Sequence, residues 1–169
     1  MLVREAMPSD AAGLAELIQQ VENTSQYMLW EPGERNIQPD QQQRMMERIQ
    51  GEDNSTILVA EQDDRLMGYL FAIGGKPKKT KHSAYLVIGI HQDYRGKGVG
   101  SLLFNELNQW AAHHHIRRLE LTVVSRNEPG LALYKKMGFD IEGTKKESLF
   151  INGEYVDEYY MSKIFQQKD

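Results

Sequence analysis

The segment IGIHQDYRGKGVGSLL, residues 88–103, marks the point where a predicted strand ends and a helix begins. Glycines stand at 96, 98 and 100, and Val99 starts a series of apolar residues at helical spacing. Helix N-termini carry unpaired N–H groups and the positive end of the helix dipole, so they bind phosphate readily. Glycine lets the backbone approach an anion closely, and Arg95 and Lys97 add positive charge. The segment therefore predicts a phosphate-binding loop.

Three kinds of phosphate loop compete for this segment. The P-loop pattern GxxxxGK[ST] is absent from it. The dinucleotide pattern G-x-G-x-x-G fails because Ser101 stands where the third glycine is needed, counting from Gly96. The third pattern, R/Q-x-x-G-x-G/A, fits Arg95, Gly98 and Gly100. A glycine-rich turn that only caps a helix is the structural alternative.

The rest of the chain predicts a mixed α/β domain with the order βααβββαβαββ. Alternating or continuous apolar runs indicate strands, and apolar residues three or four apart indicate helices. These patterns predict a short first strand, an antiparallel meander of three strands, a βαβ unit, and a closing hairpin around Asn152-Gly153. The predicted strands span 2–4, 55–61, 66–73, 83–91, 118–124, 140–150 and 154–163, and the predicted helices begin near residues 10, 40, 98 and 128.

Length and composition fit a single domain over residues 1–169. Lys and Arg number 20 and Asp and Glu 24, and the net charge of −4 argues against nucleic acid as the main partner. The sequence has no cysteine, which excludes disulfides, thiolate metal sites and a catalytic thiol. The run His113–His115 is interpreted as a solvated helix end, so no metal is expected. The N-terminal residues lack the pattern of a signal peptide and no stretch is apolar enough to cross a membrane, so we expect a cytoplasmic protein.

A second segment, SRNEPGLALYKKMGF at residues 125–139, resembles the pattern N-x(4)-A-x-x-Y-x-x-x-G-F. Together with the pattern at Arg95, Gly98 and Gly100, it is similar to the two hallmarks of the GNAT acetyltransferase superfamily. The resemblance covers essentially the whole chain. It implies the GNAT fold, in which two central parallel strands splay apart, and acetyl-CoA as the co-substrate.

The resemblance also implies which residues bind the cofactor. The strand before the phosphate loop is expected to carry a bulge, placed at Gly89, whose free N–H groups pair with the pantetheine arm and polarise the thioester carbonyl. Tyr134 is expected near the CoA sulfur, where it protonates the leaving thiolate, although packing alone is the alternative role. The implied cofactor-binding residues are Ile88, Gly89, Ile90, Arg95, Gly96, Lys97, Gly98, Val99, Gly100, Ser101, Asn127 and Tyr134.

The general base and the acceptor site stay open. Thr122 occupies the position where some family members have a glutamate, so Glu120, Glu31, His91 or a water chain are candidates. The irregular stretch after the first helix and the closing hairpin are expected to form the acceptor pocket, with Tyr27, Trp30, Glu31 and Tyr155 as its residues. Solvated carboxylates and a local aromatic cluster are the structural alternatives.

The expected function is transfer of an acetyl group from acetyl-CoA to a primary amine of a small molecule or a peptide N-terminus, by direct attack. We expect the reaction to require no metal and the protein to bind neither nucleic acid nor a membrane. Because members of the family are often dimers, a homodimer is possible. Two alternatives are a CoA-binding regulatory module without turnover, which Thr122 keeps open, and a transferase that uses another acyl-CoA donor.

Overall fold

The computed structural model describes residues 1–166, and its strands form one mixed sheet in the order β1-β2-β3-β4-β5-β7-β6. Neighbouring strands are antiparallel except β4 and β5, which are parallel. The strands are β1 (Leu2–Glu5), β2 (Thr56–Gln62), β3 (Arg65–Gly74), β4 (Ser83–Ile90), β5 (Arg118–Val124), β6 (Asp140–Ile151) and β7 (Glu154–Ile164).

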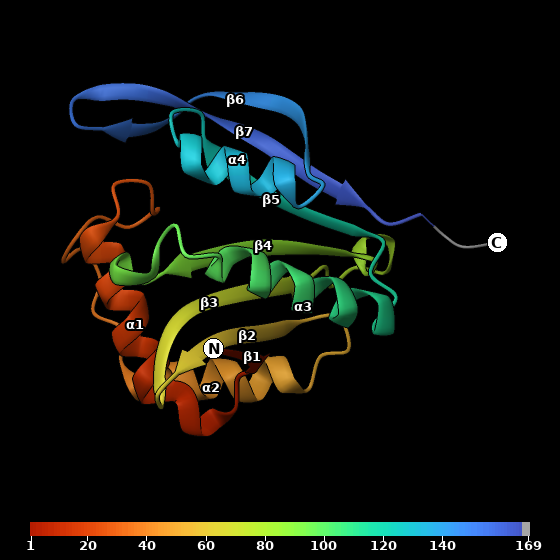
Figure 1. Ribbon diagram of the computed structural model, residues 1–169. Coiled ribbons are helices and arrows are strands. Elements are labelled where there is room, and N and C mark those ends of the chain that lie inside the picture. The colour runs from red at the N-terminus through yellow and green to blue at the C-terminus, as the bar shows by residue number, and fades with distance from the viewer. Residues whose placement is uncertain (167–169) are drawn as a thin grey trace.

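Helices cover both faces of the sheet, with α3 in front of it and α2 behind it in Figure 1. Within residues 1–166, none of them has the length and apolar character that a membrane crossing requires. The helices are α1 (Ala11–Thr24), α2 (Pro39–Gln50), α3 (Val99–His113) and α4 (Glu128–Lys136), and short 3-10 turns span Pro8–Asp10, Lys78–Thr80 and Gln92–Tyr94.

The sheet separates two apolar cores because its strand residues alternate between the two faces. On one face, α1 and α2 pack on Val59 and Phe71 of β2 and β3. On the other face, α3 packs on Leu70 and Leu86, and α4 contacts the same core. The helical spacing predicted for α3 is confirmed, since Val99, Leu103, Leu107 and Trp110 are all buried there.

The parallel pair β4–β5 is joined over only a short stretch. The ladder pairs Ser83–Tyr85 with Arg118–Glu120, and within residues 1–166 it does not extend to the later residues of either strand. The two strands therefore diverge toward their carboxyl ends, as Figure 1 shows on its left side. This confirms the splayed central strands that the family resemblance implies. We call the space between β4 after Tyr85 and β5 after Glu120 the strand gap, and its open end lies beside the predicted phosphate loop that follows β4.

Local turn chemistry agrees with the sequence. Asn152 and Gly153 both have positive φ, 50° and 79°, as a tight hairpin turn between β6 and β7 requires. Gly138 follows α4 with φ 93°, the left-handed conformation expected just after a helix end. The predicted element order is confirmed. The single domain predicted over 1–169 stays a prediction, and residues 167–169 lie outside the described part.

The bulge predicted at Gly89 is wrong. The β3–β4 register runs residue by residue from Gly68–Ile90 to Gly74–Ala84 without a shift. Gly89 instead makes room for a side chain of β3: a Cβ at this position would lie 2.4 Å from Cζ of Tyr69. Close approach, rather than an extra residue, explains this strand glycine.

Candidate active site

The edge of β4 that faces the strand gap carries backbone groups available to a ligand. In an antiparallel ladder, every second residue turns its N–H and C=O to the partner strand. Ser83 and His91 bond β3 through Gly75 and Met67, at 2.9 and 2.8 Å, so the odd-numbered residues of β4 face β3. Ile88 and Ile90 therefore direct their N–H groups into the gap, whereas the N–H of Gly89 belongs to the β3 ladder.

The predicted phosphate loop leads from this strand into α3. Gly96 and Gly98 have φ of 73° and 84°, a conformation that residues with a side chain rarely adopt. Gly98 occupies the N-cap position of α3, so the unpaired N–H groups of the first helical turn follow it directly. Gly100 serves packing, because a Cβ there would lie 2.6 Å from Cδ2 of Leu133 on α4. The loop thus has the backbone geometry of an anion site.

The two cations of the loop have partners in this structure. Arg95 donates from Nε to the carbonyl of Ile90 at 3.3 Å and from Nη2 to Oγ1 of Thr24 at 3.2 Å. Its guanidinium therefore ties the loop to the end of α1. The ammonium of Lys97 lies 5.5 Å from the ring centroid of Tyr94. Both charges stay close to the N-terminus of α3, where they favour an anion.

Three further predicted cofactor residues have structural roles of their own. Val99 is buried in the core, so only its backbone can reach a ligand. The Ser101 hydroxyl accepts a hydrogen bond from Lys136 at 3.4 Å. Asn127 caps α4, since its Oδ1 accepts from the N–H of Gly130 at 3.1 Å. Because Oδ1 of Asn127 is occupied, only its Nδ2 group is available to bind a cofactor. The cofactor-binding role of Asn127 stays a prediction.

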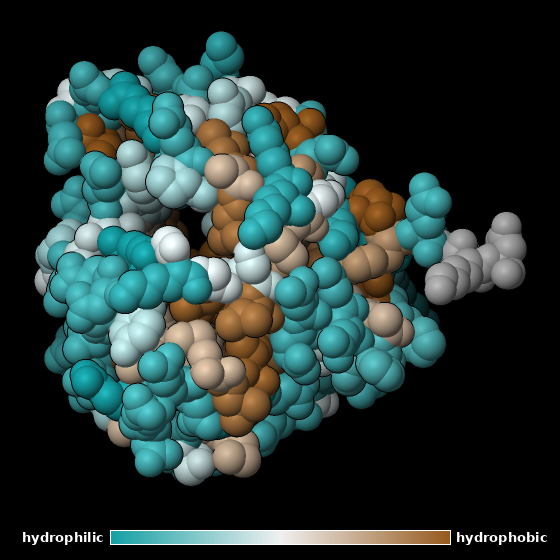
Figure 2. Space-filling model, viewed as in Figure 1, coloured by the Kyte–Doolittle hydropathy of each residue, from teal (hydrophilic) through white to brown (hydrophobic). Residues whose placement is uncertain are grey.

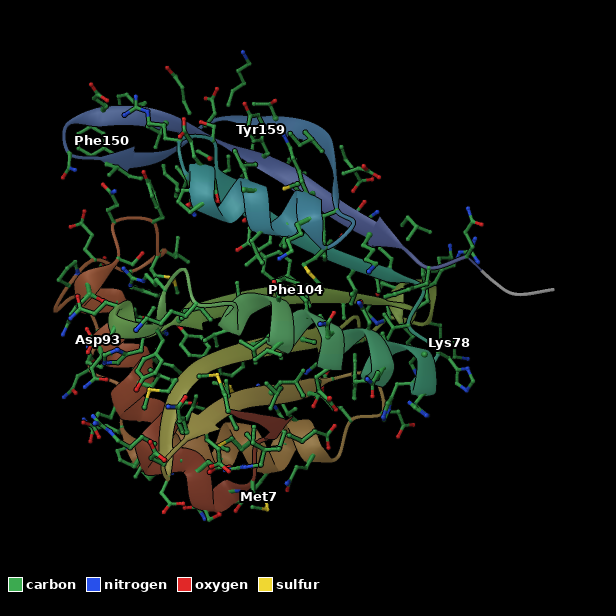
Figure 3. The ribbon with its side chains drawn as sticks, in the orientation of Figure 1. Met7, Lys78, Asp93, Phe104, Phe150 and Tyr159 are labelled. Atoms are coloured by element: carbon green, nitrogen blue, oxygen red, sulfur yellow. The ribbon has the colours of Figure 1, made fainter. Side chains whose placement is uncertain are left out.

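Tyr134 stands on α4, near Tyr85 of β4. Its ring packs edge-on against Phe104 of α3, with centroids 5.9 Å apart, and Figure 3 shows Phe104 between the two helices. Burial, and secondarily the nearby Tyr85, raise the pKa of Tyr134 to about 12. The phenol therefore keeps its proton at neutral pH and can act only as a donor there. In the view of Figure 1, the molecular surface in Figure 2 has a hollow that is partly bordered by apolar side chains.

A pair of hydroxyl groups bridges the two diverging strands. Tyr85 of β4 pairs in register with Glu120, and its side chain extends along the gap to Thr122 of β5. The two oxygens, Tyr85 Oη and Thr122 Oγ1, lie 3.0 Å apart. Sequence analysis noted Thr122 only as a missing carboxylate, and it did not identify Tyr85. We name this contact the hydroxyl bridge.

The structure weakens three of the candidates for a general base. Glu120 is bound by Arg118, whose Nε donates to Oε2 at 2.9 Å, and lies where the strands are still paired. His91 accepts from the N–H of Asp93 at Nδ1 over 3.1 Å, which places the proton of the neutral ring on Nε2. Its Nε2 is then a donor. Glu31 is exposed, in the loop between α1 and α2. A water chain remains consistent with the geometry.

The loop of residues 25–38 contacts the connection between β5 and α4. The Tyr27 hydroxyl donates to the carbonyl of Arg126 at 3.4 Å and so joins this loop to the β5–α4 connection. Trp30 is 38% exposed, and the guanidinium of Arg35 lies 5.2 Å from its ring centroid. These contacts place Tyr27 beside the site, while Trp30 packs with its own loop.

Tyr155 lies away from the strand gap. It is 66% exposed and packs on Phe150 across the β6–β7 hairpin, with ring centroids 5.0 Å apart. It lies five residues from Tyr160, the β7 partner of Thr122, or about 16 Å along the strand. Contact with an acceptor at the hydroxyl bridge would require a large molecule, so a direct role for Tyr155 stays a prediction.

A buried polar cluster beneath the site had no signal in the sequence. Glu22 of α1 is 1% exposed, and its Oε1 accepts from Nε of Arg35 at 2.8 Å. Within residues 1–166, Oε2 of Glu22 and the hydroxyl of Tyr69 have no hydrogen-bond partner. Burial and the nearby Glu22 raise the pKa of Tyr69. The Glu22–Arg35 pair anchors the loop of residues 25–38 to α1.

Arg35→Ala is expected to lower the free energy of unfolding by about 2–3 kcal/mol, because it leaves the buried Glu22 carboxylate unpaired. The value falls below that of a fully buried pair because water reaches the Arg35 end. Urea denaturation measures it. Arg44→Ala is the matched control, since Arg44 pairs with Asp40 at the surface and should change stability by less than about 0.5 kcal/mol. Equal effects of the two substitutions would contradict an anchoring role.

Comparison with known proteins fits this geometry. The family model described as "Acetyltransferase (GNAT) family" matches residues 19–139, which include the strand gap, the phosphate loop and Tyr134. The chain belongs to the GNAT acetyltransferase family. Within the described residues, no group of His, Cys, Asp and Glu side chains is arranged to hold a metal ion.

One relative and two solved structures show how far the similarity extends. The L-amino acid N-acetyltransferase AaaT of Escherichia coli is 37% identical over 108 residues, 63% of this chain and 67% of the relative. A GNAT-family acetyltransferase from Streptococcus pneumoniae is 31% identical with a TM-score of 0.93, covering 97% of this chain and 99% of that one. The yncA protein of Salmonella typhimurium, solved with acetyl-CoA, has a TM-score of 0.86 at 20% identity, over 99% and 95% of the two chains.

Proposed function

We propose that this protein transfers the acetyl group of acetyl-CoA to the primary amine of an amino acid or a short peptide. The observation that carries the proposal is the strand gap, which opens beside a glycine-rich helix N-terminus. The gap exposes the N–H groups of Ile88 and Ile90, and the loop of residues 95–100 follows at its open end. A long cofactor with a pyrophosphate at one end and a thioester at the other fits this layout.

Each end of the cofactor meets a different kind of protein group in this proposal. The pyrophosphate lies at the N–H groups after Gly98, with Arg95 and Lys97 nearby. The pantetheine arm runs along the gap edge of β4, and the N–H of Ile88 or Ile90 polarises the thioester carbonyl. The arm enters from the phosphate loop, so the acyl end points back along β4 toward Tyr85.

The absence of cysteine in the sequence excludes an acyl-cysteine intermediate and supports reaction by direct attack. The amine nitrogen forms a bond to the carbonyl carbon, the carbon–sulfur bond breaks, and Tyr134 donates its proton to the leaving thiolate. Water takes the proton that the amine loses. Holding both substrates in one gap supplies the orientation that a bimolecular reaction in solution lacks.

The acceptor side of the gap carries groups suited to an amine. Glu158 of β7 pairs with Val124 and is half-buried on the same sheet face as Thr122. Its Oε1 accepts from the Ser148 hydroxyl at 2.9 Å, which leaves the other carboxylate oxygen for an ammonium group. Asp157 is less suitable, because neighbouring residues of a strand point to opposite faces and it therefore faces away from Thr122; its Oδ1 accepts from the backbone N–H of Glu147 at 2.7 Å. The relative that acetylates L-amino acids supports this acceptor class.

Thiol release from acetyl-CoA tests the acceptor class with L-amino acids, short peptides, polyamines and aminoglycosides. We expect turnover with L-amino acids, and a decrease in kcat/KM of about 10-fold or more in Glu158→Gln, because a charge-assisted hydrogen bond is lost. Turnover of peptides but not of amino acids would indicate that the acceptor is the N-terminal amine of a peptide or protein. Bound acetyl-CoA without turnover of any amine would favour the regulatory module instead. The cytoplasmic location and a homodimer stay predictions.

A further inference from the structure

At the end of the strand gap where β4 and β5 are paired, the side chains of Tyr85 and Thr122 cover the sheet face on which the acceptor is proposed to bind. We call this cover the roof of the gap. Tyr85 and Thr122 lie on the sheet face opposite α3, since Tyr85 is in register with Glu120 and Thr122 follows two residues later. The hydroxyl bridge between them spans 3.0 Å across the diverging strands. It covers the first part of the gap, just beyond the last paired residues.

The other sides of this part of the gap are also closed. Toward the amino ends of the strands, Ser83–Tyr85 and Arg118–Glu120 are hydrogen-bonded to each other. On the face of α3 and α4, Tyr134 packs on Phe104 and forms the wall. Tyr134 is also close enough to Tyr85 for the Tyr85 hydroxyl to raise its pKa. An acyl group held near Tyr134 therefore lies next to the hydroxyl bridge.

We infer that the hydroxyl bridge between Tyr85 and Thr122 sets the length of the acyl group that the enzyme accepts, restricting the donor to acetyl-CoA. The inference rests on the proposed function, because it places the thioester at the gap edge of β4. An acyl chain longer than acetyl that continues along the line of the pantetheine arm meets the paired strands or the hydroxyl bridge. The paired backbone is fixed, so the side chains of the bridge decide the limit.

The preference of a binding site for one acyl length over another can be estimated from the effect of single methylene groups on specificity. One extra methylene that a binding site cannot accommodate changes specificity by roughly 10–200-fold. Butyryl-CoA adds two methylenes to the acetyl group, so we expect the wild-type protein to bind it at least about 10-fold more weakly than acetyl-CoA. Tyr85→Ala removes the roof, and the ratio of the two dissociation constants should then approach one.

Val87→Ala is the matched control. Val87 lies two residues farther along the same face of β4, and both side chains are 40% exposed. A general loosening of the strand would change the ratio in both variants, whereas a roof effect appears in Tyr85→Ala alone. Thr122→Val keeps the volume and removes the hydroxyl, so it should widen donor use less than Tyr85→Ala does.

Calorimetry with acetyl-CoA, propionyl-CoA and butyryl-CoA gives these ratios without an acceptor, and thiol release then gives the ratios of kcat/KM. Selective rescue of butyryl-CoA binding by Tyr85→Ala supports the inference. An unchanged ratio in Tyr85→Ala, or equal affinities in the wild type, overturns the inference and leaves the proposed function standing. Failure of the wild type to bind any of the three donors overturns the proposed function, and the inference with it.

Discussion

Replacing Tyr134 with Phe is expected to lower kcat by about 100-fold or more while the affinity for acetyl-CoA stays near the wild-type value. The substitution removes the proton donor and retains the ring that packs against Phe104 at 5.9 Å. Stability should therefore change little. Steady-state kinetics and calorimetry measure the two quantities separately, and full activity in the variant would leave Tyr134 with a packing role only.

Tyr159→Phe is the matched control for this prediction. Tyr159 is another half-buried tyrosine packed at the edge of the same core, on β7, and Figure 3 shows it beside α4. Loss of its hydroxyl should leave kcat within about threefold of the wild type, since the bound sulfur is expected at Tyr134. Equal losses in both variants would indicate a general effect of hydroxyl removal and contradict the assignment.

The pH dependence of kcat tests the same residue. Burial raises the pKa of Tyr134 from its ordinary value to about 12, so the protonated form extends to higher pH than for a free tyrosine. The acid should therefore be intact throughout the neutral range. We expect no decrease in wild-type kcat from loss of this proton below roughly pH 11. A decrease with a midpoint below pH 9 that disappears in Tyr134→Phe would contradict the stated pKa shift.

Gly98→Glu is expected to weaken acetyl-CoA binding by roughly 100- to 1,000-fold. A carboxylate about 4 Å from a phosphate near the protein surface costs on the order of 4 kcal/mol, which corresponds to the upper end of that range. The new side chain also starts from φ 84° at the N-cap of α3, where the backbone must turn its N–H groups to the anion. Calorimetric titration with acetyl-CoA measures the loss.

Gly153→Glu provides the control for charge and strain. Gly153 has φ 79°, and like Gly98 it has no atom within 4 Å of an added Cβ. It lies at the β6–β7 turn, far along the chain from the phosphate loop. The control should therefore bind acetyl-CoA as the wild type does. Normal binding in Gly98→Glu would remove the phosphate-loop assignment, and loss in both variants would attribute the effect to unfolding.

Much of the fold could be predicted because its signals are local. The helical spacing from Val99 to Trp110, the turn at Asn152-Gly153 and the glycines of the phosphate loop each depend on neighbouring residues only. The order of the elements followed from these signals. The splayed strands came from the family resemblance, since no short pattern in either strand shows how far β4 and β5 stay paired.

The features that sequence analysis missed depend on pairing between distant segments. An isolated strand glycine is compatible with a bulge or with close approach of another group, and Gly89 was assigned wrongly because its β3 neighbour, Tyr69, is known only from the register. The hydroxyl bridge likewise requires the β4–β5 register, which brings Tyr85 to Thr122. The Glu22–Arg35 pair joins a helix to an irregular loop without any periodic signal.

Amide hydrogen exchange, measured by NMR residue by residue with and without acetyl-CoA, shows most directly whether the cofactor occupies the gap between β4 and β5. We expect slower exchange at Ile88 and Ile90, whose N–H groups face the strand gap, and at the first turn of α3 after Gly98. Gly89 is the internal control, because its N–H already belongs to the β3 ladder and should not change. Binding of acetyl-CoA without protection at Ile88 and Ile90 would show that the cofactor does not occupy the gap between β4 and β5.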